Sequence, residues 1–174
     1  MLSVGSHAPS FSLAGVQNGG RESYDLTTHT SAGNAVLVLF YPFDFSPACT
    51  QELCSVRDAE WFTLVDDLHV WGISTDSTYA HEQFAAAYQF QFPLLSDTDG
   101  SVASAFGVLY DEWEEHKHVP KRAVFLVDSD QTIRYAWATD DAYDEPELSA
   151  IKRALDELGS FRADFTQSDG VFDS

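Results

Sequence analysis

The sequence predicts an α/β fold in which a central mixed β-sheet carries helices on both faces. Segments typical of strands and of helices alternate along most of the chain, which is the order of a layered α/β protein. Near the C-terminus two strand-like segments are separated only by SDQ, which is short enough for a hairpin, and a hairpin makes the sheet mixed. The 174 residues suffice for one domain with a substantial core. We expect a single domain over residues 1–159 and an acidic tail over 160–174.

The N-terminal part predicts a hairpin, a buried strand and the start of a helix. Residues 1–30 are rich in Gly, Ser and Thr, and NGG at 18–20 is a turn signal. NAVLVLFYP, which ends at Pro42, is continuously apolar and predicts a buried central strand. Ser46 and Pro47 then suit an N-cap and a first helical turn. Helical spacing of apolar residues continues through Leu53, Val56, Trp61, Leu64 and Val65.

The middle of the chain alternates between strand and helix. HVWGIST at 69–75 predicts a second buried strand, and TYAHEQFAAAY predicts a helix with Phe84 and Tyr88 on one face. FPLLSD predicts a short extended segment, and GSVASAFGV predicts a short helix that ends near Gly107. YDEWEEHKHVPK, which follows, is expected to be an acidic loop that carries histidines.

The C-terminal part supplies the hairpin and a last helix. RAVFLVD and TIRYAWAT predict the two strands of the hairpin. EPELSAIKRALDELG predicts an amphipathic helix, with Pro146 near its start and Gly159 at its end. The apolar face of this helix consists of Leu148, Ile151, Leu155 and Leu158.

The net charge of −19, from 28 Asp and Glu residues against 9 Lys and Arg residues, limits the possible partners. It repels nucleic-acid phosphates and anionic membranes, so we expect neither as a partner. No apolar run approaches the roughly 20 residues that span a bilayer, and MLSVGSHAPSF shows no secretory signal, so we expect a cytoplasmic protein. The acidity fits either high solubility or adaptation to multimolar salt, which screens self-repulsion, and we favour a salt-adapted organism.

The two cysteines of the chain, Cys49 and Cys54, lie in the helix that is expected to start at Ser46. Cys49 lies three residues after this N-cap, near free backbone N–H groups and the positive end of the helix dipole, which favour the reactive thiolate. Residues i and i+5 of an intact helix are rotated by about 140° and rise by about 7.5 Å. A disulfide needs Cα atoms within about 4.4–6.8 Å, so the two thiols can bond only if part of the helix unwinds. The spacing indicates a pair that cycles through local unfolding.

Other interpretations of the cysteines stay open on spacing alone. Both could be small buried apolar residues, as free cysteines often are. A zinc site needs four ligands, which His116 and His118 could complete, and we disfavour it. Histidines and tryptophans elsewhere are expected at the surface or in packing; these are His7, His29, His69, His81, Trp71, Trp113 and Trp137.

FYPFDFSPACTQELC at 40–54 resembles the active-site segment of the peroxiredoxins, whose core pattern is Pro-x-x-x-Thr/Ser-x-x-Cys. Pro42, Ser46 and Cys49 match this pattern. The second cysteine, five residues later, is similar to that of the atypical two-cysteine subfamily called bacterioferritin-comigratory protein or peroxiredoxin Q. VGSHAPSFSL, VWGISTDS, FPLLSDTDGSVASAFGV and RAVFLVD also resemble family segments in matching order, so the resemblance covers most of the chain.

The resemblance implies a thioredoxin-like fold and a thiol-dependent peroxidase that reduces hydrogen peroxide and organic hydroperoxides. Cys49 would be the peroxidatic thiolate and would become a sulfenic acid. Cys54 would resolve it as an intramolecular disulfide, which a thioredoxin-like reductant would reduce. No cofactor and no metal are implied, and the intramolecular pair favours a monomer.

The resemblance also assigns supporting roles. Ser46 would hydrogen-bond the peroxide, Pro42 would shield the pocket, and Arg122 would stabilise the developing charge. Glu52, between the cysteines, would have a lesser role. Ser46 in place of the commoner Thr, and Ala48 in place of the usual Gly, depart from the pattern without removing a reacting group.

Two functions of other classes compete with the peroxidase. A redox-sensing protein would use the same chemistry of Cys49 but relay oxidation to a partner with little turnover. A binding module of the same fold would use its acidic surface and keep inert, buried cysteines, which would resist thiol labelling when folded.

Overall fold

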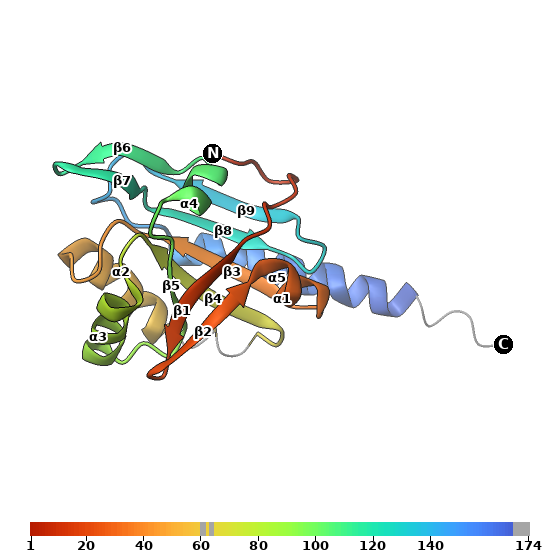
Figure 1. Cartoon of the computed structure of the whole chain (residues 1–174). Helices are drawn as coiled ribbons and strands as arrows, with labels where there is room; N and C mark the ends of the chain where they lie inside the picture. Colours follow the sequence, from red (N-terminus) through yellow and green to blue (C-terminus); the bar gives the residue numbers. More distant parts are fainter. Residues whose placement is uncertain (60–61, 63–64, 169–174) are drawn as a thin grey trace.

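The computed structural model of the chain describes residues 1–59, 62 and 65–168, and for 160–168 the backbone alone. A seven-stranded sheet in the order β2-β1-β5-β4-β3-β8-β9 forms the centre, with helices on both of its faces (Figure 1). The sheet contains parallel and antiparallel pairs, so the predicted α/β fold with a mixed sheet is confirmed. None of the described helices is both long enough and apolar enough to cross a membrane.

The N-terminal hairpin forms one edge of the sheet, as expected. β1 (Ser12–Gln17) pairs antiparallel with β2 (Gly20–Asp25). Asn18 and Gly19, which connect them, both have positive φ (51° and 78°), the backbone of a tight hairpin turn. The short helix α1 (Leu26–Ser31) follows.

β3 (Ala35–Phe40) is an interior strand between β4 and β8, and all six of its residues are buried. It pairs in parallel with β4 (Leu68–Ser74), which in turn pairs in parallel with β5 (Leu94–Ser96). On its other side β3 pairs antiparallel with β8 (Ala123–Val127), and β8 forms the expected hairpin with β9 (Ile133–Ala138). A continuously apolar strand is stable here because both of its faces are covered.

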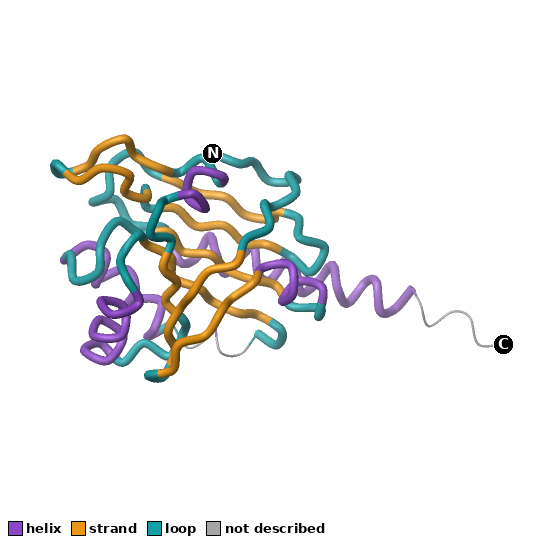
Figure 2. Tube along the Cα trace, in the orientation of Figure 1, coloured by secondary structure: helices purple, strands orange, loops and turns teal. Residues whose placement is uncertain are grey.

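Each face of the sheet has its own apolar core. α1 and α4 (Ser101–Ala105) cover one face, over a core that includes Trp71. α2 (Pro47–Asp58), α3 (Thr78–Tyr88) and α5 (Leu148–Ser168) cover the other face, and Figure 2 shows the helices on either side of the strands. Cys49 belongs to this second core. Successive β3 residues alternate between the two cores, which is the period of two of a strand.

The segment expected as an acidic loop is a hairpin, so that prediction is wrong. β6 (Leu109–Trp113) and β7 (His116–Pro120) form a separate two-stranded antiparallel sheet. The turn between them uses Glu114 and Glu115, both at positive φ (49° and 63°). Charged residues rarely adopt this backbone, so the sequence gives no turn signal there.

Two helix boundaries also differ from expectation. α2 ends at Asp58, because Ala59 turns to an extended backbone with ψ of 90°, and Val65 lies in a bend; Trp61 and Leu64 fall outside the described residues. α5 continues past Gly159 to Ser168, away from the body of the sheet (Figure 2). A glycine within an exposed helix costs about 1 kcal/mol, which a long helix tolerates. The tail over 160–174 stays a prediction, and its first residues are helical.

Candidate active site

Cys49 lies in the first turn of α2, at the end of the loop that leaves β3. Ser46 has an extended backbone (φ −66°, ψ 143°), and its Oγ accepts a hydrogen bond from the backbone N–H of Cys49 at 3.3 Å. Pro47 occupies the first turn, where it needs no N–H partner. The predicted N-cap is thus confirmed. The helix start aims its positive end at a cysteine that is only 1% exposed.

Arg122, the residue immediately before β8, brings a fixed positive charge to this thiol. Its Nη2 donates to Cys49 Sγ at 3.2 Å, and the whole side chain is buried. The Ala142 carbonyl accepts from Arg122 Nε at 3.0 Å and from Nη2 at 2.8 Å, which fixes the plane of the guanidinium. A guanidinium keeps its charge in proteins, so the sulfur of Cys49 faces a permanent cation at hydrogen-bond distance.

Glu52 holds the far side of the same guanidinium. It lies one turn after Cys49 in α2, and its Oε2 accepts from Arg122 Nη1. Its other oxygen, Oε1, is buried and has no hydrogen-bond partner among the described residues. Burial therefore raises the pKa of Glu52 to about 7, although the charge of Arg122 pulls in the opposite direction. Burial by itself lowers the pKa of Arg122, but Glu52 and Cys49 outweigh it and the net shift is upward.

Pro42 is the buried second residue of the loop that connects β3 to α2, which begins at Tyr41 and ends at Ser46. Phe45, between them, has a φ of 66°, a left-handed conformation that is uncommon for a bulky residue. Ser46 and Arg122 thus both contact Cys49, Ser46 at its backbone N–H and Arg122 at its sulfur. Pro42 shares their loop.

Cys54 lies within the same intact helix, and both cysteines are free thiols. Cys54 is half-buried, whereas Cys49 is buried. Residues five apart in a helix cannot meet the geometry of a disulfide without a change of backbone. The folded helix therefore keeps the two thiols apart, as the spacing predicts.

Sequence reasoning missed two parts of this site. The carbonyl of Ala142, which orients Arg122, is a backbone group and leaves no signal in the sequence. His81, expected at the surface or in packing, is fully buried, with Asp44 and the carbonyl of Leu95 at its two ring nitrogens. Across the described residues, no group of three or more His, Cys, Asp or Glu side chains could hold a metal ion.

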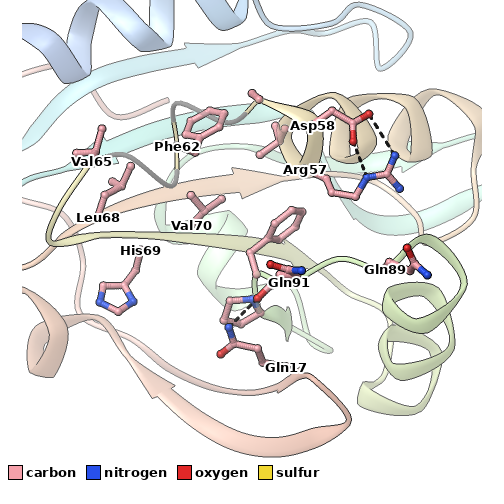
Figure 3. Close-up of a pocket in the computed structure, with 14 residues that line it drawn as sticks. Gln17, Arg57, Asp58, Phe62, Val65, Leu68, His69, Val70, Gln89 and Gln91 are labelled. Atoms are coloured by element: carbon pink, nitrogen blue, oxygen red, sulfur yellow. Dashed lines mark hydrogen bonds and ion pairs between the residues drawn. The ribbon is translucent and has the colours of Figure 1, made fainter.

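A pocket of about 510 Å³ flanks the opposite end of α2 (Figure 3). Arg57 and Asp58 form an ion pair on one side of it, and Gln17 bonds the carbonyl of Gln91 on another. Neither Cys49 nor Arg122 lines this pocket, so it is separate from the thiol site.

The family model described as AhpC/TSA family matches residues 4–136. Among curated proteins, Peroxiredoxin Bcp of Escherichia coli (strain K12) is 37% identical over 142 residues, which covers 78% of this chain and 85% of that protein. The chloroplastic Peroxiredoxin Q of Oryza sativa subsp. japonica is 32% identical over 136 residues, covering 78% of this chain and 59% of that protein.

Solved structures agree with the sequence comparisons. The reduced 2-Cys peroxiredoxin of Plasmodium vivax superposes with a TM-score of 0.81 at 25% identity, covering 92% of this chain and 83% of that one. Peroxidoxin BcpB of Mycobacterium tuberculosis gives 0.74 at 27% identity, covering 92% and 98%. With the buried Cys49 against Arg122 at the head of α2, these matches show that the chain belongs to the AhpC/TSA family, as a peroxiredoxin of the Bcp and peroxiredoxin Q type.

Proposed function

We propose that this peroxiredoxin reduces hydrogen peroxide and organic hydroperoxides through Cys49, that Cys54 resolves the oxidised thiol, and that a thioredoxin-like dithiol restores both. The observation that carries the proposal is the contact of 3.2 Å between Arg122 Nη2 and Cys49 Sγ at a helix N-terminus. A fixed cation and a helix start both favour the thiolate, which is the nucleophile in this chemistry.

In the first step the Cys49 thiolate attacks one peroxide oxygen. An S–O bond forms as the O–O bond breaks, and the other oxygen leaves as hydroxide or alkoxide and takes up a proton. Cys49 becomes a sulfenic acid, and the peroxide is reduced to water or an alcohol. The Ser46 hydroxyl accepts from the N–H of Cys49, so its own proton can be donated to the peroxide. Arg122 would stabilise the negative charge on the leaving oxygen. Pro42 would shield the peroxide pocket at Cys49.

In the second step the Cys54 thiolate attacks the sulfur of the Cys49 sulfenic acid. The S–S bond forms, and the hydroxyl group leaves as water after it takes up a proton. This step requires part of α2 to unwind, because the intact helix separates the two residues. A dithiol reductant would then return both cysteines to thiols by exchange.

We further propose that the chain acts as a monomer in the cytoplasm of a salt-adapted organism. An intramolecular pair needs no second subunit for resolution. A chain with a net charge of −19 folds more favourably when salt screens the repulsion between its acidic groups.

The mass of the intact protein after one equivalent of hydrogen peroxide tests the chemistry. The wild type should lose about 2 Da, the two thiol hydrogens, and a Cys54→Ser variant should carry a sulfenic acid on Cys49 that a dimedone-type reagent traps. A Cys49→Ser variant is the matched control and should stay unchanged. If the wild-type mass does not change within seconds, the proposed peroxidase chemistry is wrong.

A further inference from the structure

A buried polar network holds the loop of residues 42–46 that leads into Cys49. Asp44, in the middle of this loop, has its Oδ2 at 2.7 Å from His81 Nδ1 on α3. The hydroxyl of Tyr41 donates to the other oxygen of Asp44, also at 2.7 Å. The side chains of His81 and Asp44 are 0% and 2% exposed, so neither group can exchange its partner for water.

The hydrogen-bond partners fix how many protons this pair holds. His81 Nε2 lies at 2.9 Å from the carbonyl oxygen of Leu95, which only accepts, so Nε2 carries a proton. His81 Nδ1 faces a carboxyl oxygen, and a second proton must lie between those two atoms. Asp44 and His81 therefore share one proton in a buried hydrogen bond, which is among the stronger kinds in a protein. Removing either side chain takes away this bond and leaves the facing atom of the other, Asp44 Oδ2 or His81 Nδ1, buried without it.

A second contact fixes the backbone of the same residue. The N–H of Asp44 donates to Asp76 Oδ2 at 2.9 Å, and the hydroxyl of Ser74 donates to that same oxygen at 2.6 Å. Asp44 is thus held by its side chain to α3 and by its backbone to the segment that connects β4 to α3.

The next residue shows why such a firm hold matters. Phe45 has a φ of 66°, a conformation that costs a bulky residue about 1–3 kcal/mol and therefore persists only where the surroundings enforce it. Phe45 lies between the fixed Asp44 and Ser46, which caps α2. The anchor at Asp44 therefore sets the direction in which the chain reaches Ser46.

We propose that Asp44 and His81 are positioning residues for the peroxidase reaction. They touch no reacting atom. They hold the loop so that the Ser46 hydroxyl lies within hydrogen-bond reach of the peroxide oxygen when Cys49 attacks. This inference rests on the proposed chemistry of Cys49. It also assigns a role to a histidine on α3 that is far from the cysteines in the sequence.

The test is the second-order rate constant for oxidation of Cys49 by hydrogen peroxide, measured by rapid quench and mass in the Cys54→Ser background. Asp44→Ala and His81→Leu should each slow oxidation by about tenfold or more, because a misplacement of about 1 Å costs up to about a hundredfold. Asp44→Asn should recover most of the rate. The amide can donate to Nδ1 of a neutral His81 and accept from Tyr41, so it keeps every bond of the network.

A double-mutant cycle separates positioning from a general loss of stability. If Asp44 acts through Ser46, then Asp44→Ala should slow a Ser46→Ala variant much less than it slows the parent. Asp97→Ala is the matched control. Asp97 is also a buried carboxylate, but it accepts from the N–H groups of Val102 and Ala103 at the start of α4. Its loss should therefore lower the unfolding midpoint and leave the rate unchanged.

Each result decides the inference. A parent protein that does not react with peroxide refutes the proposed function itself. If the parent reacts and the folded Asp44→Ala variant reacts equally fast, or if Asp97→Ala is slowed as much, the positioning role is wrong. Should Asp44→Ala not fold, Tyr41→Phe removes one bond of the network at little cost in volume. We expect it to be slowed measurably, and an unchanged rate would refute the role.

Discussion

Arg122 is shared between the sulfur of Cys49 and the carboxylate of Glu52, and this sharing defines the site at the scale of single residues. The guanidinium has two further bonds to the carbonyl of Ala142, so it cannot turn away from either partner. Glu52 keeps the buried cation partly neutralised, and its own Oε1 lacks a partner among the described residues. A change at Arg122 or Glu52 should therefore alter the reactivity of the Cys49 thiol.

Replacing the cation should slow the first chemical step. We expect Arg122→Met to lower the rate of Cys49 oxidation by hydrogen peroxide by about a hundredfold or more, because charge stabilisation in a buried site is worth about 3 kcal/mol. Rapid-quench oxidation followed by mass measures this rate. Arg153→Met, at an exposed position of α5, is the control and should react as the parent does. An Arg122→Met protein that is folded and reacts at the parental rate would refute the electrostatic role.

Glu52 should make the stability of the fold depend on pH. Its pKa rises from 4.5 to about 7 in the folded state, mainly through burial, so between these values the folded chain binds one proton more than the unfolded chain. The free energy of unfolding must then fall as the pH rises from about 4.5 to about 7, by about 3 kcal/mol from this group alone. Urea unfolding at several pH values measures the slope.

Other buried acids contribute to the same slope, so the comparison must isolate Glu52. Burial also raises the pKa of Asp44 and of Asp97. A Glu52→Gln variant keeps an oxygen for Arg122 but cannot titrate, so the difference between variant and parent belongs to Glu52. If both proteins lose the same stability between pH 5 and pH 8, the raised pKa of Glu52 is refuted.

At the scale of elements, the proposed mechanism needs α2 to be a helix in the first step and to open in the second. Its N-terminal turn supports the reactive thiol through Ser46, while the intact turns beyond it keep Cys54 away. In this mechanism Cys49 reacts while the first turn of α2 is intact, whereas Cys54 reaches Cys49 only after the helix opens. The rate of disulfide formation should follow the free energy of opening the helix.

A glycine in α2 should speed the second step. Gln51 is exposed and lies between the cysteines, and Gln51→Gly should destabilise the helix by about 0.5–1 kcal/mol. We expect conversion of sulfenic acid to disulfide to become about two- to fivefold faster, as measured by mass over time. The same replacement in α3, Gln83→Gly, is the matched control and should leave this conversion unchanged. Equal rates in parent and Gln51→Gly would mean that opening of α2 does not limit disulfide formation.

Elements with a strong local signal could be predicted from the sequence, and the others could not. The apolar run of β3 and the Ser46-Pro47 start of α2 are determined by neighbouring residues, and both are where the sequence places them. The β6–β7 hairpin has apolar pairs such as Leu109–Pro120 at its base and the charged pair Glu112–Lys117 near a turn of two glutamates, so its strands lack the usual alternation. The contact between Asp44 and His81 joins positions 37 residues apart, and local patterns carry no information about it.

At the scale of the whole molecule, the net charge of −19 is the most unusual property. We expect the chain to be more stable in about 3 M KCl than in about 0.1 M KCl, because ions reduce the Debye length to about 3 Å or less and screen the self-repulsion. Unfolding midpoints in the two solutions measure the effect. Sulfate salts would also strengthen apolar burial, so KCl is the better probe. Equal midpoints would refute salt adaptation.

Leu53 lies immediately before Cys54 in α2, and its side chain is fully buried in the core beneath the helix. A bridge between the two sulfurs would require the backbone on both sides of Leu53 to leave its helical path, which would pull this side chain towards solvent. The apolar side chain of Leu53 would then be exposed to solvent in the oxidised protein and buried in the reduced one. A reductant that contacts Leu53 would therefore bind the disulfide form in preference to the dithiol form. It would dissociate once the disulfide is reduced and Leu53 is buried again.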